Sequence, residues 1–186
     1  MTAPVYQYPG ELERDVTLGD GARIHLRPIR PDDEERLISF HEGLSGQTAY
    51  QRFFNVMKNL PRAFARFLAN VDYRRRLALV AEHGNGSSRM LVGVARYDCI
   101  GEPAIAEIAF VIGDDWQNRG LGTILLEALL SAAAARGIDR FRAYVLASNG
   151  RMLDMLTRFT DICYRHTEGG VTELFFTRRP LPTGSR

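Results

Sequence analysis

The sequence AIAEIAFVI at residues 104–112 is followed closely by QNRGLGTILL at residues 117–126. The first stretch is almost wholly apolar, which is typical of a strand in the middle of a sheet that is covered on both faces. From Ile124 onward, apolar residues recur at helical spacing, and Gly137 can take the left-handed conformation that ends such a helix. The two stretches therefore predict a buried strand, a turn containing Gly120 and Gly122, and a long helix.

The turn between this strand and this helix is suited to binding an anion. Glycine lets a ligand approach the backbone closely, and the free N–H groups of the first helical turn favour negative charge. We expect the Arg119 side chain to add charge there and the Thr123 hydroxyl to add a hydrogen bond. A dinucleotide fingerprint needs a third glycine where Leu125 stands, and a P-loop needs a lysine after Gly122, so neither pattern fits. Two glycines alone are also compatible with a simple chain reversal.

The rest of the chain predicts alternating helices and strands. We expect a hairpin with its turn at residues 19–21, a helix capped by Asp32, and a second helix after Pro61. Further strands are expected at residues 77–81, 90–97, 141–146 and 172–177, with a short helix at 149–159. This order predicts an α/β (α+β) fold with a mixed, largely antiparallel central sheet flanked by helices. Residues 1–15 would form an N-terminal arm, residues 16–180 the domain, and residues 181–186 a C-terminal tail.

Composition narrows the class of protein. The 186 residues suit one domain, and a formal net charge of +2 gives no reason to expect a nucleic-acid partner. The two cysteines, Cys99 and Cys163, cannot form a disulfide framework and indicate a reducing compartment. No clustered His/Cys spacing predicts a metal site, and no signal peptide or apolar run of roughly 20 residues predicts export or a membrane span. We therefore expect a cytoplasmic protein.

The segment from Phe110 to Leu126 resembles the acetyl-CoA-binding motif of the GNAT superfamily, Gln/Arg-x-x-Gly-x-Gly/Ala after a strand. The resemblance implies that backbone groups of Phe110, Val111 and Ile112 bind the pantetheine arm of acetyl-CoA. It also implies that the pyrophosphate is held by backbone N–H groups of a run of residues: Gln117, Asn118, Arg119, Gly120, Leu121, Gly122 and Thr123. Asn149 matches the asparagine that faces the cofactor near its thiol.

The resemblance extends over residues 23–177. Arg27-Pro28-Ile29-Arg30-Pro31-x-Asp33, Phe40, Tyr50-x-Arg52-Phe53-Phe54 and Asn149-x-x-Met152-Leu153 are similar to bacterial protein-lysine acetyltransferases of this superfamily. It implies a single GNAT-like domain that transfers an acetyl group to a primary amine, most specifically a protein lysine. Related enzymes that acetylate small amines or amino acids share much of this pattern, so a small acceptor stays open. The acceptor itself, and whether the protein is a monomer or a homodimer, are not decided by the sequence.

Acetyl transfer to a lysine needs a base, because the amine has a reference pKa near about 10.4. Glu107 is the only ionisable residue between Pro103 and Ile112, and strand alternation places it on one face with Ala109 and Val111. A carboxylate in such apolar surroundings would be a good base near neutrality. Glutamate here also resembles the general base of the protein acetyltransferases. The alternative is a structural carboxylate paired with an arginine of the sheet.

Other residues carry weaker expectations. The family often uses a tyrosine seven residues after the asparagine as a general acid, and here that position is Leu156, so we assign no acid. A catalytically silent CoA-binding sensor therefore also stays open. We expect His41 and Trp116 to pack rather than to catalyse, and the pair Phe53-Phe54 to lie in the core.

Overall fold

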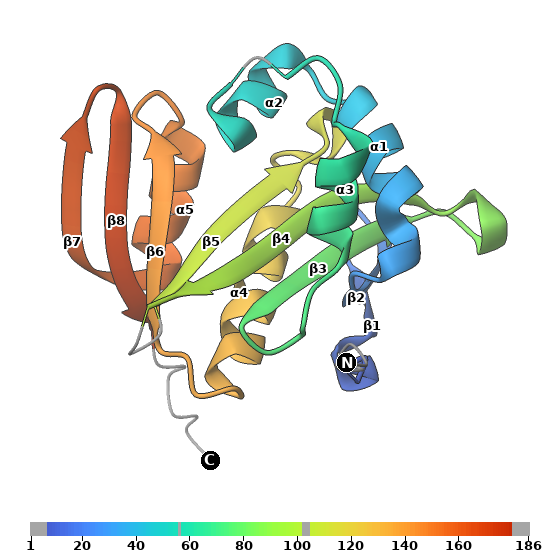
Figure 1. Ribbon diagram of the computed structural model, residues 1–186, viewed down its shortest axis with the longest axis horizontal. Coiled ribbons are helices and arrows are strands. Elements are labelled where there is room, and N and C mark those ends of the chain that lie inside the picture. The colour runs from blue at the N-terminus through green and yellow to red at the C-terminus, as the bar shows by residue number, and fades with distance from the viewer. Residues whose placement is uncertain (1–6, 56, 102–104, 180–186) are drawn as a thin grey trace.

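The computed structural model describes residues 7–55, 57–101 and 105–179. Its strands form one eight-stranded sheet with the order β1-β2-β3-β4-β5-β6-β8-β7 (Figure 1). The strands are β1 (Arg14–Thr17), β2 (Arg23–Pro28), β3 (Arg76–His83), β4 (Met90–Ile100), β5 (Ile105–Ile112), β6 (Arg140–Leu146), β7 (Thr160–Glu168) and β8 (Val171–Arg178). The predicted mixed, largely antiparallel sheet is confirmed.

Five helices cover the sheet: α1 (Glu34–Glu42), α2 (Gly46–Phe53), α3 (Arg62–Ala69), α4 (Leu121–Ala134) and α5 (Gly150–Phe159). In Figure 1, α1 and α3 lie in front of the sheet and α4 lies behind it. In the described ranges, no helix is both long and apolar enough to cross a membrane. The predicted stop of α4 is confirmed, because Gly137 has a φ of 76°.

Only β5 and β6 run parallel among the described strands, and α4 is part of the connection between them. Their register joins Ala106 to Phe141 and Glu107 to Arg142, and no further pair joins the two strands within the residues that the structure describes. Beyond Glu107 the two strands diverge (Figure 1). The backbones of β5 and β6 therefore separate in the middle of the sheet, from Glu107 and Arg142 onward. We call this separation the opening.

The expectation that β5 is covered on both faces is only partly confirmed. Ala106 and Ile108 are buried, whereas Ile105, Glu107 and every position from Ala109 to Ile112 are only partly buried. Where β6 turns away from β5, the side chains of β5 lack part of the cover that a continuous sheet and a full helical layer would give.

The structure adds one helix and one strand to those expected. Helix α2 has few large apolar residues, and its start is fixed by Ser45, whose side chain accepts a hydrogen bond from the Thr48 N–H. Strand β7 forms an edge of the sheet, and most of its positions are exposed, so it lacks the alternation that marks a half-buried strand. The pair Phe53-Phe54 is only partly in the core, because Phe54 ends α2 in the left-handed conformation and is exposed.

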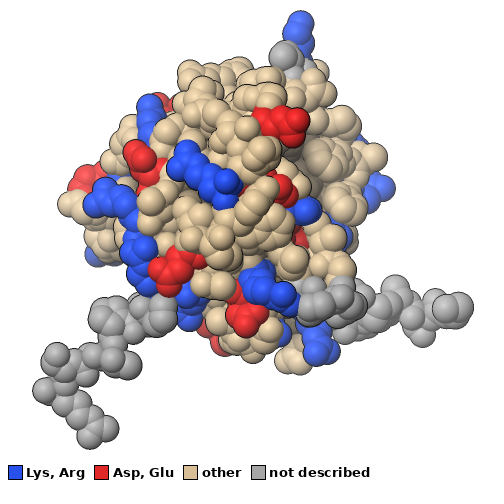
Figure 2. Space-filling view, turned by 90° about the vertical axis from the view of Figure 1, so that its left-hand side faces the viewer, with Lys and Arg blue, Asp and Glu red and all other residues tan. Residues whose placement is uncertain are grey.

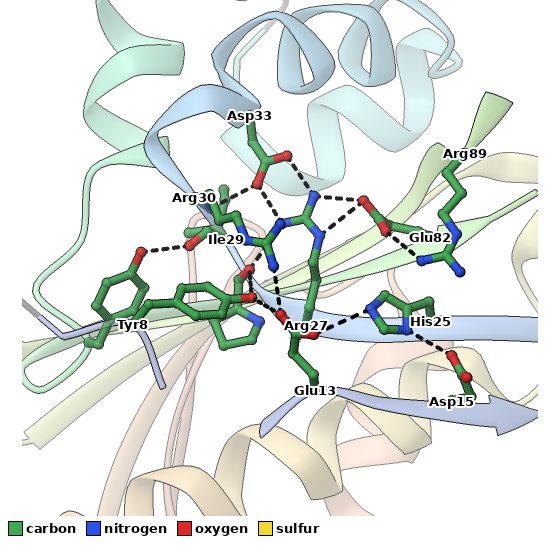
Figure 3. Close-up of polar contacts among 12 residues, drawn as sticks. Tyr8, Glu13, Asp15, His25, Arg27, Ile29, Arg30, Asp33, Glu82 and Arg89 are labelled. Atoms are coloured by element: carbon green, nitrogen blue, oxygen red, sulfur yellow. Dashed lines mark hydrogen bonds and ion pairs between the residues drawn. The ribbon is translucent and has the colours of Figure 1, made fainter. Parts of the chain in front are cut away.

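The helix start predicted at Asp32 is shifted by one residue. Asp33 precedes α1, and its carboxylate accepts hydrogen bonds from the Arg30 backbone N–H and from Arg27. Arg27 is buried and also donates to Glu82, at 2.6 Å (Figure 3). Burial would raise the pKa of Asp33, but the hydrogen bonds from Arg27 and Arg30 outweigh it and hold that pKa below its ordinary value. The Arg27-to-Asp33 motif thus ties α1 to the sheet.

The residues expected as an arm also contact the domain. A short 3-10 helix covers Gly10–Leu12, and β1 begins at Arg14. Glu13 accepts hydrogen bonds from Tyr8 and Arg30, each at 2.6 Å (Figure 3). Residues 1–6 of that arm, Ala104 of the predicted strand and the tail at residues 181–186 lie outside the described residues.

Candidate active site

The opening between β5 and β6 exposes one edge of β5. Phe110, Val111 and Ile112 pair with β4 on their other side, and β6 pairs with none of them. Backbone donors and acceptors on this edge must find other partners, because unpaired peptide groups are costly when buried. The arrangement suits an extended, amide-bearing ligand lying alongside these residues.

The glycine turn lies directly after this edge. Gly120 has a φ of 87° and Asn118 a φ of 60°, both left-handed. The first bond of α4 runs from the Ile124 N–H to the Gly120 carbonyl at 3.2 Å, so the N–H groups of Leu121, Gly122 and Thr123 precede the helical hydrogen bonds. These three groups lie at the positive end of a 14-residue helix, an arrangement that suits an anion.

Gly122 has a second reason to be glycine. A Cβ at this position would lie 3.3 Å from the Met155 sulfur of α5. A side chain at this position would therefore require the Met155 side chain to shift by a few tenths of an ångström.

Asp114, just before the turn, ties it to the start of α2. Its carboxylate accepts hydrogen bonds from the Ser45 hydroxyl at 2.6 Å, the Ser45 N–H at 2.9 Å and the Thr48 hydroxyl at 2.8 Å. Burial would raise the pKa of Asp114, but these hydrogen bonds outweigh it and lower that pKa. Helix α2 and the turn thus form one hydrogen-bonded unit.

The Gln117 side chain continues this unit. Its amide nitrogen donates to the Thr48 hydroxyl at 3.1 Å and to the Ile112 carbonyl at 3.2 Å. Its oxygen accepts a hydrogen bond of 2.9 Å from Arg151 of α5. One residue of the turn therefore links α2, the end of β5 and α5.

Glu107 lies at the point where β5 and β6 part. Its Oε2 accepts a hydrogen bond of 2.7 Å from Nη2 of Arg142, the residue opposite it on β6. On the other side, its cross-strand neighbour on β4 is Asp98. The expectation of apolar surroundings is wrong, because the carboxylate is 38% exposed and stands in a row of charged side chains. The ion pair expected under the structural alternative is present, and it also fixes the carboxylate at the opening.

Comparison with known proteins agrees with this geometry. Residues 23–159 match the family model described as "Acetyltransferase (GNAT) domain". The chain belongs to the GNAT acetyltransferase family.

Its relatives within the family include named acetyltransferases. The chain is 35% identical to "Acetyltransferase Pat" of Mycolicibacterium smegmatis over 157 residues, which cover 84% of this chain and 46% of that protein. It is 34% identical to "Acetyltransferase PA5475" of Pseudomonas aeruginosa over 140 residues, 75% of each chain. The GNAT domain of S. lividans PAT superposes with a TM-score of 0.82 at 35% identity, covering 92% of this chain and 99% of that one. Because the match covers 46% of the mycobacterial Pat, the chain spans about half the length of that relative.

The side chains of the GNAT turn differ in part from expectation. Arg119 was expected to add charge to the anion site, but it pairs with Asp20 at 2.5 Å and lies over the Trp116 ring, 4.2 Å from its centroid. Its positive charge is therefore already partly balanced. Trp116 packs between Arg119 and His83, whose ring centroid is 4.6 Å away, as expected for a packing residue.

Asn149 caps the start of α5. Its side-chain oxygen accepts a hydrogen bond of 3.2 Å from the Met152 N–H, which caps the helix. The capping bond uses the amide oxygen. The role of Asn149 toward the cofactor stays a prediction. Leu156, where the family often has a tyrosine, is fully buried in the core.

Two arginines that the sequence did not single out as site residues contribute to this face. Arg142 is recognisable only once β6 is aligned with β5, since 34 residues separate it from Glu107 in the chain. Arg52, from the last turn of α2, lies within electrostatic reach of Arg96, Asp98 and Glu107. Burial and the neighbouring charge of Arg96 lower the pKa of Arg52 to about 10.

Proposed function

We propose that this GNAT domain transfers an acetyl group from acetyl-CoA to a primary amine, most specifically the side chain of a protein lysine, with Glu107 as the general base. The observation that carries this proposal is the place of Glu107, at the last paired position before β5 and β6 diverge. Acetyl-CoA would lie along the free edge of β5, with its pyrophosphate on the N–H groups from Gln117 to Thr123. Its thioester would supply the acetyl group at the opening.

The residues of the chain divide the chemistry between them. Glu107 removes a proton from the acceptor ammonium, directly or through one water molecule, and the free amine attacks the thioester carbonyl. A C–N bond forms and the C–S bond breaks, and coenzyme A leaves as a thiolate, which is a tolerable leaving group near neutral pH. The second proton that the nitrogen loses as the amide forms passes, directly or through water, to this thiolate, and free coenzyme A is released as the thiol. Arg142 keeps the carboxylate directed at the opening. A tyrosine acid is not required, which is compatible with the buried Leu156.

A protein acceptor is supported by the openness of the site. Glu107 is accessible rather than enclosed, so a lysine at the surface of a folded partner can reach it. On the side of the molecule at β7, basic and acidic side chains are interspersed, so that side presents no single sign of charge to a partner (Figure 2). The names of the relatives identify acetyltransferases but do not state an acceptor.

The test is an acetylation assay with defined controls. The protein is incubated with labelled acetyl-CoA and a cell lysate, and labelled products are identified by mass spectrometry. We expect label on protein lysines with the parent protein and a strong loss with Glu107→Gln. Glu127→Gln, an exposed glutamate of α4, is the matched control and keeps full activity.

Two outcomes would favour the other candidates. Label on small amines alone would favour an acetyltransferase for small molecules. Tight acetyl-CoA binding without transfer to any acceptor would favour a CoA-binding sensor.

A further inference from the structure

The helix that carries Arg52 is held by the same hydrogen bonds that organise the glycine turn. Arg52 lies in the last turn of α2, a helix whose first turn is bound by Asp114 and Gln117. Helix α2 contacts β5, and it lies near the end of β5 on the side of the opening (Figure 1). Arg52 therefore lies on a helix packed against β5, and its side chain is within electrostatic reach of Glu107.

Unlike the other arginines of this face, Arg52 has no acceptor for its donors among the described residues. Its guanidinium lies over the ring of its neighbour Phe53, with 4.9 Å from the guanidinium carbon to the ring centroid. The residue is only partly buried, so the five N–H donors of the guanidinium are open to a ligand. Arg96 and Arg142, by contrast, each donate to a carboxylate.

The acidic side chains around Arg52 are already paired with other arginines. Asp98 accepts hydrogen bonds from Arg76 at 2.7 Å and from Arg96 at 3.0 Å. Glu107 accepts its bond from Arg142. Of Arg52, Arg96 and Arg142, only Arg52 therefore forms no salt bridge among the described residues, although Asp98 and Glu107 lie within its electrostatic reach.

We propose that Arg52 binds a carboxylate carried by the acceptor, close to the amine that reacts at Glu107. This inference rests on the proposed function, because it takes the opening at Glu107 as the acceptor site. A planar guanidinium binds a carboxylate through two parallel hydrogen bonds, and such a bond would satisfy the donors that Arg52 leaves unused. The acceptor amine would then lie at Glu107 while its carboxylate lies at Arg52.

The carboxylate has two possible sources that share this chemistry. It is either the α-carboxylate of a free amino acid or the side chain of an aspartate or glutamate beside the acceptor lysine of a protein. Both sources exclude a purely cationic acceptor such as a diamine as the preferred substrate, because such a molecule would add positive charge beside Arg52.

The test measures binding, so that it does not depend on turnover. The full chain with coenzyme A is titrated with matched probes by NMR. The first pair is lysine and lysinamide, and the second is a lysine-containing peptide with aspartate or with asparagine beside the lysine. In one pair we expect the carboxylate form to bind at least about tenfold more tightly, the equivalent of one charged hydrogen bond. The pair that shows the preference identifies the source.

Variants then assign the preference to Arg52. Arg52→Gln should abolish it, and Arg52→Lys should restore part of it, because lysine keeps the charge but lacks the planar fork. Arg62→Gln removes an exposed arginine of α3 and should leave the preference unchanged.

Equal affinities within both pairs for the parent protein would overturn the inference, whether or not the Arg52 variants fold. A carboxylate preference without any acetyl transfer would instead contradict the proposed function and leave the role of Arg52 standing. Acetyl transfer without a carboxylate preference would support the proposed function and overturn the role of Arg52.

Discussion

Glu107 and Arg142 face each other across the parallel pairing of β5 and β6, joined by a hydrogen bond of 2.7 Å at the last position before the strands diverge. The pairing gives the carboxylate a fixed direction at the opening. Arg142 is itself held from the other side, since its guanidinium carbon lies 4.9 Å from the centroid of the Tyr144 ring. The candidate base is therefore oriented by a neighbouring strand rather than by its own strand alone.

Replacing Arg142 by methionine should lower kcat by about tenfold, because Glu107 would lose the bond that orients it. The double variant with Glu107→Gln should be hardly slower than Glu107→Gln alone, since residues that act as a unit are not additive. Steady-state kinetics of the two single variants and the double variant measure this coupling. Arg140→Met, at an exposed position of the same strand, is the control. Additive losses in the double variant would show that Arg142 acts independently of Glu107.

Gly120→Ala should weaken acetyl-CoA binding. The φ of 87° at Gly120 costs an alanine about 1–2 kcal/mol, and relief of that strain would displace the N–H groups of the turn. We expect an increase in the acetyl-CoA Kd of about tenfold, measured by titration calorimetry. Gly10→Ala, where no positive φ is required and nothing lies within 4 Å of a new Cβ, should leave the Kd unchanged. An unchanged Kd in Gly120→Ala would show that the turn does not hold the cofactor.

Asp114→Asn should loosen α2 from the turn. The carboxylate accepts three hydrogen bonds from Ser45 and Thr48, and weakening bonds to a charged group costs about 1–3 kcal/mol of unfolding free energy. The pKa of Asp114 is lowered in the folded protein, so this contribution is present above the ordinary aspartate pKa and disappears as the pH falls through the folded pKa. Chemical denaturation should show a stability difference between parent and variant at pH 7 that shrinks toward acid pH. A difference that is independent of pH would mean that the charge of Asp114 contributes nothing.

His41 should make the fold sensitive to mild acid. It is 4% exposed, and neither ring nitrogen has a hydrogen-bond partner among the described residues. Burial lowers its pKa, so the folded protein keeps it neutral while the unfolded chain takes up a proton below about pH 6.5. The free energy of unfolding should therefore fall as the pH drops below that value, until the folded pKa is reached.

His41→Leu provides the comparison for this prediction. It removes the titrating group and keeps an apolar side chain against Phe53, whose ring centroid lies 5.5 Å from that of His41. Denaturation curves between pH 7 and pH 5 should be flatter for the variant than for the parent. Equal slopes would contradict the role of His41.

The central part of the fold could be predicted because its signals are local. The apolar run of β5, the glycine turn and the apolar stripe of α4 follow one another directly, and the stop at Gly137 depends on a single residue. Helix α2 and strand β7 escaped prediction because distant partners define them. Ser45, which caps α2, is itself held by Asp114, 69 residues away, and β7 is held by backbone pairing to β8.

The candidate site could also be predicted from the sequence only where its signals are local. Residues of the strand and turn could be named from the motif, because the motif is contiguous. The surroundings of Glu107 could not, since they depend on the register that places Arg142 opposite it and on the α2 geometry that places Arg52 nearby. Strand alternation gave the face of Glu107 but not its neighbours on other strands.

The rate of a single turnover in Glu107→Gln tests the central claim most directly. Protein loaded with acetyl-CoA is mixed with an acceptor that the parent acetylates, and acetyl transfer is followed by rapid quench, with acetyl-CoA affinity measured in parallel. We predict a loss of about 10²–10⁴-fold in the rate, as expected for removal of a general base, with an unchanged acetyl-CoA Kd. A rate close to that of the parent, with acetyl-CoA binding intact, would contradict the account.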